Sequence, residues 1–129
     1  MDAKYPKRFM KKLHSSWRPM AESKIYSFIG LAKKAGGVAA GDYAVEYAIK
    51  RGRAACVILA EDASPNTAKK YRNYCGVRGI KLISFGAKRR LGQILGKEVY
   101  SVIAITDKRF SSRIEEMIGA ANHDNRVDG

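Results

Sequence analysis

The sequence is poor in several residue types, and each shortage excludes a class of protein. Its 129 residues include only two cysteines, three prolines and one tryptophan. Two cysteines cannot build the disulfide framework of a small secreted domain, so we expect both to be buried thiols in a reducing cytoplasm. No apolar run approaches the about 20 residues that a membrane-spanning helix needs, and no apolar secretory core follows the N-terminus. We therefore expect neither a transmembrane segment nor secretion.

Groupings of residues that carry out chemistry are also scarce. The two cysteines and the two distant histidines, His14 and His123, show no metal-ligand spacing. The stretch Gly92–Glu98 looks like a phosphate-binding loop, but it has too few residues between its glycines and a glutamate where Ser or Thr is needed. Glu61 and Asp62 are adjacent on an extended segment, so they point apart and suit a loop or cap. We therefore expect no catalytic residue, no metal and no cofactor, and a protein that is not an enzyme.

Acidic residues are the remaining shortage, because 25 lysines and arginines stand against only 12 aspartates and glutamates. The formal net charge is +13, of which residues 1–24 carry +5 and the rest of the chain +8. Such a field attracts polyanions and says nothing about the fold. RNA, DNA and anionic membranes all fit the charge alone, and for a small basic domain we favour nucleic acid.

Helical and strand-like patterns alternate along most of the chain. Because the connections between them are short, we expect an α/β fold with layers around one sheet. Ser23 is a suitable cap for the first helix, and Ser64 with Pro65 suits the start of the third. The predicted helices run from Ser23 to Ala35-Gly36-Gly37, from Gly41-Asp42 to Gly52, and over Ser64–Cys75, Ala87–Leu95 and Lys108–Ala121. The predicted strands are Val38–Ala40, Cys56–Ala60, Lys81–Ser84 and Tyr100–Thr106.

The chain divides into three segments by composition. Residues 1–22 form a basic N-terminal arm that holds two of the three prolines and the only tryptophan. Apolar residues recur every four positions in this arm, so a short amphipathic helix is one interpretation. A disordered arm that orders on RNA is the interpretation we favour. Residues 23–121 form the predicted domain, and residues 122–129 a polar C-terminal tail that frays.

Three short motifs follow one another in an order that is typical of a known family. Asp-Ala-Ser-x-Asn-Thr-x-Lys-Lys occupies Asp62–Lys70, Leu-Gly-x-x-x-Gly-Lys-Glu occupies Leu91–Glu98, and Ile-Ala-Ile-Thr-Asp occupies Ile103–Asp107. Their order and spacing within Lys24–Gly119 resemble the kink-turn-binding ribosomal protein family of archaeal and eukaryotic large subunits, and above all its small bacterial YlxQ-like branch. The resemblance implies a three-layer α-β-α sandwich around a mixed, roughly four-stranded sheet, and the binding of structured RNA.

The turn that opens the second predicted helix is the first candidate RNA-binding site. Gly41 and Asp42 stand where a helix offers unpaired N–H groups and partial positive charge to a phosphate. The resembling family reads sheared G·A pairs at this turn with an Asn, a Glu and a following Lys. This chain has Tyr43, Ala44 and Tyr47 at those positions. The sequence therefore predicts that a standard kink-turn binds poorly.

An exposed stripe is predicted along the same helix. Tyr43, Tyr47 and Lys50 all lie off the apolar face that the neighbouring residues form. Tyrosine rings can stack on unpaired bases. They can also pack against the N-terminal arm or the first helix, and the sequence leaves both interpretations open.

The cationic triplet Lys88, Arg89 and Arg90 is the second candidate site. Successive residues of a helix point in different directions, so the three side chains cannot all face one ligand. The resembling family places a lysine at the position of Lys88 beside a flipped-out nucleotide, and Leu91 belongs to its loop-to-helix turn. A solvated cationic face is the other interpretation, and we favour contacts with RNA phosphate.

These features together predict a non-catalytic protein that binds structured RNA, in particular ribosomal RNA. We expect a ribosomal protein or a ribosome-associated factor that is cytoplasmic, that has no membrane as partner and that is a monomer off RNA. The alternative is an adapter whose basic arm docks on an acidic protein or on an anionic membrane surface.

Overall fold

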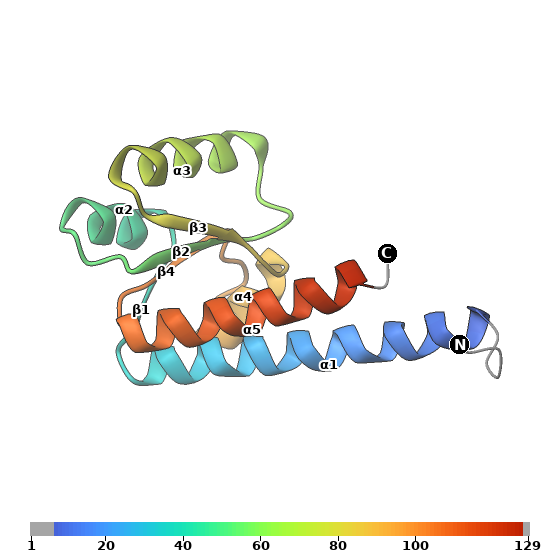
Figure 1. Ribbon diagram of the computed structural model, residues 1–129. Coiled ribbons are helices and arrows are strands. Elements are labelled where there is room, and N and C mark those ends of the chain that lie inside the picture. Colours follow the sequence, from blue (N-terminus) through green and yellow to red (C-terminus); the bar gives the residue numbers. More distant parts are fainter. Residues whose placement is uncertain (1–6, 128–129) are drawn as a thin grey trace.

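The computed structural model describes the backbone of residues 7–127 and the side chains of residues 19–122 (Figure 1). Helices and strands alternate along this part of the chain, which confirms the α/β class predicted from the sequence. The elements are α1 (Lys7–Lys34), β1 (Val38–Ala40), α2 (Asp42–Lys50), β2 (Cys56–Leu59), α3 (Pro65–Arg78), β3 (Lys81–Ser84), α4 (Lys88–Leu95), β4 (Val102–Ile105) and α5 (Lys108–Val127).

The strands form one mixed four-stranded sheet in the order β1-β4-β2-β3. Strand β4 runs antiparallel to both β1 and β2, whereas β2 and β3 are parallel. Figure 1 shows α2 and α3 on one face of the sheet and α1 beside α5 on the other, while α4 packs against α1. The predicted three-layer α-β-α sandwich around a mixed sheet is therefore confirmed.

Strands β2 and β4 are buried along their whole length because both of their faces are covered. In β2, Cys56 and Ile58 join the core under α1 and α5, whereas Val57 and Leu59 join the core under α2 and α3. Side chains of β4 alternate in the same way. Continuous apolar runs are typical of strands that are buried on both faces, and these two strands anchor every loop of the candidate site.

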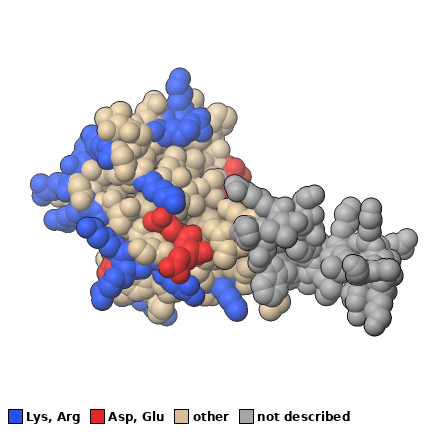
Figure 2. All heavy atoms as spheres, in the orientation of Figure 1, with Lys and Arg blue, Asp and Glu red and all other residues tan. Residues whose placement is uncertain are grey.

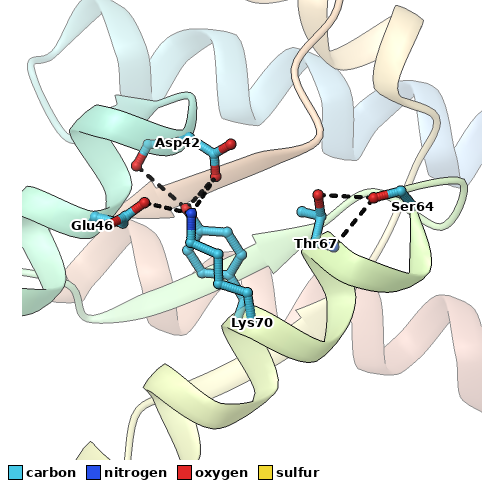
Figure 3. Close-up of polar contacts among 6 residues, drawn as sticks. Asp42, Glu46, Ser64, Thr67 and Lys70 are labelled. Carbon is cyan, nitrogen blue, oxygen red and sulfur yellow. Dashed lines mark hydrogen bonds and ion pairs between the residues drawn. The ribbon is translucent and has the colours of Figure 1, made fainter.

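Local signals in the sequence predicted several features correctly. The Ser64 hydroxyl oxygen accepts a hydrogen bond from the N–H of Thr67 at 3.2 Å, so it caps α3 as expected (Figure 3). Cys56 and Cys75 are free and buried, and burial raises the pKa of both thiols. Both predictions rest on residue type and local pattern, which do not depend on the rest of the fold.

The limits of three helices differ from the prediction. Helix α1 begins at Lys7, so Ser23 lies inside a continuous helix and caps nothing. The residues between Pro19 and Ser23 are strong helix formers, and none of them ends the helix. Helix α3 continues past Cys75, and α5 continues to Val127 because neither glycine nor proline follows Gly119 before that point.

The predicted arm and tail are therefore helical wherever the backbone is described. Most side chains of the arm lie outside the described residues, so its predicted ordering on RNA stays a prediction, as does the division of the chain at residues 22 and 122. Within the described part of the chain, no helix combines the length and the apolar character needed to cross a bilayer.

Candidate nucleic-acid interface

One edge of the sheet gathers the segments that carry the predicted site residues. The register pairs Ala40 with Ile103, and it pairs Leu59 with both Val102 and Ser84. Strands β1, β2 and β3 therefore end, and β4 begins, at the same edge of the sheet. The segments that meet there are residues 41–42, 60–64, 85–88 and 96–101.

Gly41 makes the turn from β1 into α2. Its N–H donates to the carbonyl oxygen of Val102 at 3.0 Å, and its φ of 92° lies in the region that favours glycine. A Cβ on Gly41 would stand 3.3 Å from the Tyr100 ring. No side chain caps α2, so the first N–H groups of this helix have no intrahelical partner. The head of α2 therefore offers the hydrogen-bond donors that the sequence predicted.

Asp42 is held against α3 by a small polar network (Figure 3). The Tyr71 hydroxyl donates to Asp42 Oδ1 at 2.6 Å, and Lys70 Nζ lies 3.5 Å from the same oxygen and 2.5 Å from Glu46 Oε2. Burial raises the pKa of Tyr71, and the bond to the Asp42 carboxylate raises it further, so the phenol remains a donor. Asp42 thus fixes the head of α2, and a direct contact with RNA stays a prediction.

Tyr43 and Tyr47 lie on the outer side of α2, together with the exposed Lys50. Tyr43 is 85% exposed and Tyr47 47% exposed, and α2 lies on the opposite face of the sheet from α1 (Figure 1). The rings line an open groove of about 340 Å³ beside β1, and the Arg51 guanidinium lies 5.3 Å from the centre of the Tyr47 ring. The predicted exposed stripe is therefore confirmed, and packing of these rings against the first helix is excluded.

The three cations of the triplet on α4 diverge, as expected. Arg89 lines a hollow on the surface, and Lys88 is half-buried. The Arg90 guanidinium lies 4.5 Å from the centre of the Tyr26 ring, a cation–π contact with α1. Arg89 is thus the member of the triplet that points into the hollow beside the sheet edge.

Leu91 is a core residue, and its place in the predicted binding site has to be corrected. Its side chain is 0% exposed, so it anchors α4 in the core and cannot reach RNA. A Cβ on its neighbour Gly92 would stand 2.5 Å from the carbonyl of Glu98, so the next loop crosses α4 at that point. Gly96 ends α4 with a φ of 89°, and the N–H of Lys97 donates to the Gly92 carbonyl at 2.8 Å. The Leu-Gly-x-x-x-Gly spacing therefore has a structural cause.

Two side chains from other elements hold the start of α4. Asp62 Oδ1 accepts a hydrogen bond from the N–H of Lys88 at 2.9 Å. The Tyr26 hydroxyl oxygen accepts one from the N–H of Ala87, also at 2.9 Å, and burial raises the pKa of Tyr26. The interpretation of Asp62 as a loop or cap residue is therefore confirmed. No three His, Cys, Asp or Glu side chains lie close enough to hold a metal ion in the part of the chain that the structure describes.

Sequence reasoning missed the loop between α4 and β4. Val99 is 46% exposed although it is apolar, and Lys97 is exposed beside it. Both line a hollow of about 750 Å³ that is also lined by Arg89, Gln93 and Glu98. The loop has no periodic pattern, and the only signal for it was an apolar residue in a polar stretch directly after the Gly96 turn.

Some cations of the described surface are paired with carboxylates, and those around this hollow are not. On the face in Figure 2, a group of carboxylates lies near the middle of the domain with a Lys or Arg side chain beside it, and further Lys and Arg side chains lie around the margin. On α5, Glu115 pairs with Lys81 at 3.2 Å and Glu116 pairs with Arg113 at 3.1 Å. Among residues 19–122, no ion pair involves Arg89, Arg90 or Lys97. The charge beside α4 therefore remains available to an external anion.

Known sequences are similar to most of this chain. The profile of the ribosomal protein L7Ae/L30e/S12e/Gadd45 family matches residues 23–115. The chain is 34% identical over 93 residues to the RNA-binding protein YlxQ of Bacillus subtilis strain 168, which covers 72% of this chain and 93% of that relative. It is 30% identical over 95 residues to the RNA-binding protein YlxQ of Enterococcus faecium, which covers 74% of this chain and 91% of that relative.

Solved structures share the fold. A Bacillus halodurans protein of unknown function matches with a TM-score of 0.71 and 34% identity, over 76% of this chain and 99% of that one. The Giardia lamblia 15.5kD RNA binding protein matches with a TM-score of 0.65 over 81% of this chain and 90% of that one. Its identity is 18%, so the second likeness shows the fold alone.

Proposed function

Because the chain belongs to the ribosomal protein L7Ae/L30e/S12e/Gadd45 family, in its bacterial YlxQ-like branch, we propose that it binds structured RNA without catalysing a reaction. The observation that carries the proposal is the meeting of three features at one sheet edge. They are the uncapped head of α2, the exposed Tyr43 ring, and the charges of Arg89 and Lys97, which no carboxylate among residues 19–122 pairs. We call this region, from the head of α2 across residues 96–101 to Arg89, the sheet-edge surface.

Each part of the sheet-edge surface suits one part of a structured RNA. The N–H groups at the head of α2 and the cations of α4 hold phosphates, which positions the RNA without reading its sequence. The Tyr43 ring offers a platform for an unpaired base. Val99 adds apolar contact area between them. The surface therefore favours RNA in which looped-out bases stand next to a duplex.

Ribosomal RNA in the cytoplasm is the target that we propose, either on the ribosome or during its assembly. Ribosomal RNA is rich in duplexes interrupted by unpaired bases, and the family to which the chain belongs is described as one of ribosomal proteins. The two curated relatives are described as RNA-binding proteins, which supports RNA as the partner and a role without catalysis. We propose further that the protein is a monomer when no RNA is bound.

The proposed recognition of bases differs from that of a standard kink-turn binder. Tyr43, Ala44 and Tyr47 cannot offer the amide, carboxylate and ammonium groups that an Asn-Glu pair and a Lys would present to sheared G·A pairs. Each hydrogen-bonded pairing with a base edge is worth about 1–3 kcal/mol of discrimination. Stacking on Tyr43 therefore replaces hydrogen bonding as the source of base preference.

A comparison of three RNAs tests the function and the recognition mode together. The full chain is titrated against a bulged hairpin, a standard kink-turn, and the same kink-turn with its G·A pairs replaced. We expect the bulged hairpin to bind at least as tightly as the intact kink-turn. A strong preference for the intact kink-turn would overturn the stacking mode, and failure to bind any of the RNAs at low salt would overturn RNA binding itself.

Variants of Tyr43 give the matched control for this comparison. Tyr43→Ala removes the ring and should cost about 1–3 kcal/mol of affinity for the bulged hairpin. Tyr43→Phe keeps the ring and should bind like the parent, since stacking does not need the hydroxyl. The free energy of unfolding of both variants should lie within about 0.5 kcal/mol of that of the parent, because the side chain is exposed. Equal affinity of the alanine variant and the parent would remove Tyr43 from the interface.

A further inference from the structure

A second hollow lies between α1 and α4, next to the sheet-edge surface. It has a volume of about 530 Å³, and Gly96 belongs both to it and to the hollow that contains Arg89 and Lys97. The two hollows therefore meet at the end of α4. We call the second one the α1–α4 groove. The residues of α1 that matter for its shape and charge are Ser27, Gly30, Lys33 and Lys34.

The α1–α4 groove is basic, and none of its lining residues is acidic. Lys33 and Lys34 are exposed at the end of α1, and Arg90 stands over the Tyr26 ring on the side of α4. Within residues 19–122 none of these three cations takes part in an ion pair. A hollow that gathers uncompensated positive charge attracts a polyanion.

Gly30 leaves part of the side of the groove that α1 forms without a side chain. A Cβ on Gly30 would meet no atom within 4 Å, so nothing inside the protein requires glycine there. Glycine in the middle of a helix is unfavourable relative to alanine, and its common use is to let another backbone approach closely. Together with the small Ser27, Gly30 leaves room for a ligand backbone along α1.

We propose that the α1–α4 groove holds the phosphate backbone of an RNA duplex that continues from the sheet-edge surface. The proposal rests on the proposed function and extends the contact with RNA to the first helix. Beside the apolar Leu31, Ile94 and Leu95, the groove presents two cations, a hydroxyl group and a glycine. Cations and hydroxyl groups contact phosphates, whereas the one aromatic side chain, Tyr26, is 5% exposed and lies under Arg90, so it offers no face on which a base could stack. Because Gly96 lines both hollows, a stem held at Arg89 and Lys97 would extend its backbone into this groove.

The test uses the full chain and two bulged hairpins that differ only in stem length. One stem has about 16 base pairs, the span that double-strand binders cover, and the other about 4. Gly30→Glu fills the groove and adds a negative charge in a place where the protein has room. We expect this variant to bind the long-stem hairpin about 10-fold more weakly than the parent, with little change for the short stem.

Gly76→Glu in α3 is the matched control. Gly76 also lies within a helix and is exposed, whereas Gly30 is half-buried; a Cβ on Gly76 likewise meets no atom within 4 Å, and α3 lies on the other face of the sheet. We expect Gly76→Glu to bind both hairpins like the parent. If Gly30→Glu binds the long stem like the parent, or weakens both stems equally, the duplex assignment is overturned. If the parent binds neither hairpin, the proposed function fails as well.

A second variant probes the same surface without filling the groove. Lys33→Gln with Lys34→Gln removes two charges from an exposed helix end, where substitutions leave the fold intact. Removing one cation from a phosphate should reduce the dependence of log affinity on log salt by about 0.9, so the slope for the long stem should fall by about 2. The slope for the short stem should stay unchanged. An unchanged slope for the long stem would overturn the proposal even if Gly30→Glu destabilised the protein.

Discussion

Single residues decide whether the sheet-edge surface keeps its shape. Gly41 brings the head of α2 against Tyr100, and Gly92 lets the loop after α4 cross that helix. Contact of Gly41 with RNA stays a prediction. Both glycines also place other groups of the interface, because a side chain at either position would push the loop of residues 96–101 outward.

Gly92→Ala should destabilise the fold by about 1–3 kcal/mol, which is typical of an overpacked core site. Its Cβ would stand 2.5 Å from the Glu98 carbonyl, and the backbone there cannot move without displacing Val99. Urea unfolding of the variant and the parent measures the loss.

Gly76→Ala is the control for this substitution, because it also replaces a helical glycine but in open space. It should stabilise the protein by about 0.5–1 kcal/mol. If both alanine variants unfold at higher urea than the parent, the close crossing at Gly92 is not a packing constraint.

At the scale of elements, helix starts are held by side chains that lie outside the helix. Asp62 and Tyr26 hold the start of α4, and Asp42 ties the head of α2 to Lys70 and Tyr71 on α3. These interactions join α1, α2, α3 and α4 to the same sheet edge. The edge is therefore preorganised by links between elements rather than by each helix alone.

At α5, the stability that a side chain gives to the start of the helix depends on pH. The N–H groups of Arg109 and Phe110 donate to Asp107 Oδ1 at 2.8 and 3.3 Å. Both hydrogen bonds lower the pKa of Asp107, and the bond from the Arg109 N–H has the larger effect. The pKa of Asp107 is lower in the folded chain than in the unfolded chain. The carboxylate therefore stabilises the fold at any pH above its pKa in the unfolded chain, and this stabilisation is lost as the pH falls through its pKa in the folded chain.

Asp107→Asn should therefore be less stable than the parent at neutral pH, and the gap should close in acid. The asparagine still accepts hydrogen bonds but carries no charge that could titrate. Urea unfolding of both proteins over a series of pH values measures the gap. A gap that stays constant down to strongly acidic pH would show that the carboxylate charge at Asp107 does not contribute.

At the scale of the whole molecule, positive charge is the dominant property. Residues 1–24 carry +5 and the remainder +8, so the domain itself is basic. Part of this charge is compensated on α5, where Glu115 and Glu116 pair with cations. Cations that take part in no ion pair among residues 19–122 include those around α4 and at the end of α1, next to both hollows.

RNA binding should therefore depend steeply on salt. A protein that neutralises 6–10 phosphates loses about 10³–10⁵ in affinity between about 50 and 200 mM salt, and we expect a loss at the lower end of this range. Arg89→Ala with Lys97→Ala should reduce the slope of log affinity against log salt by about 2. Filter binding to ribosomal RNA over a series of salt concentrations measures the slope for the parent and for the double variant.

Lys81→Ala with Arg113→Ala removes the same charge from cations that are paired with Glu115 and Glu116, and serves as the control. We expect its salt slope to match that of the parent. Equal slopes for the two double variants would show that only net charge matters and that α4 has no special place in the interface.

The sequence by itself determined the elements and the chemistry of this protein. Apolar periodicity located the strands and the buried faces of the helices, and residue type located the cap at Ser64 and the buried thiols. Composition gave the positive charge, and the order of three motifs gave the family. These features are local or additive along the chain, so no knowledge of the fold was needed to read them.

Only the tertiary structure decided which residues share a surface. The strand order β1-β4-β2-β3 brings residues 41–42 beside residues 96–101, although more than fifty positions separate them. It also buries Leu91 and exposes Val99, because side-chain burial at the ends of α4 depends on which loop crosses it. The α1–α4 groove depends likewise on how two helices far apart in the sequence pack together. Non-local interactions leave no periodic trace in the sequence, and for this reason the sequence predicted candidate residues such as Tyr43 and Arg89 but not the surface that they share with Val99 and Lys97.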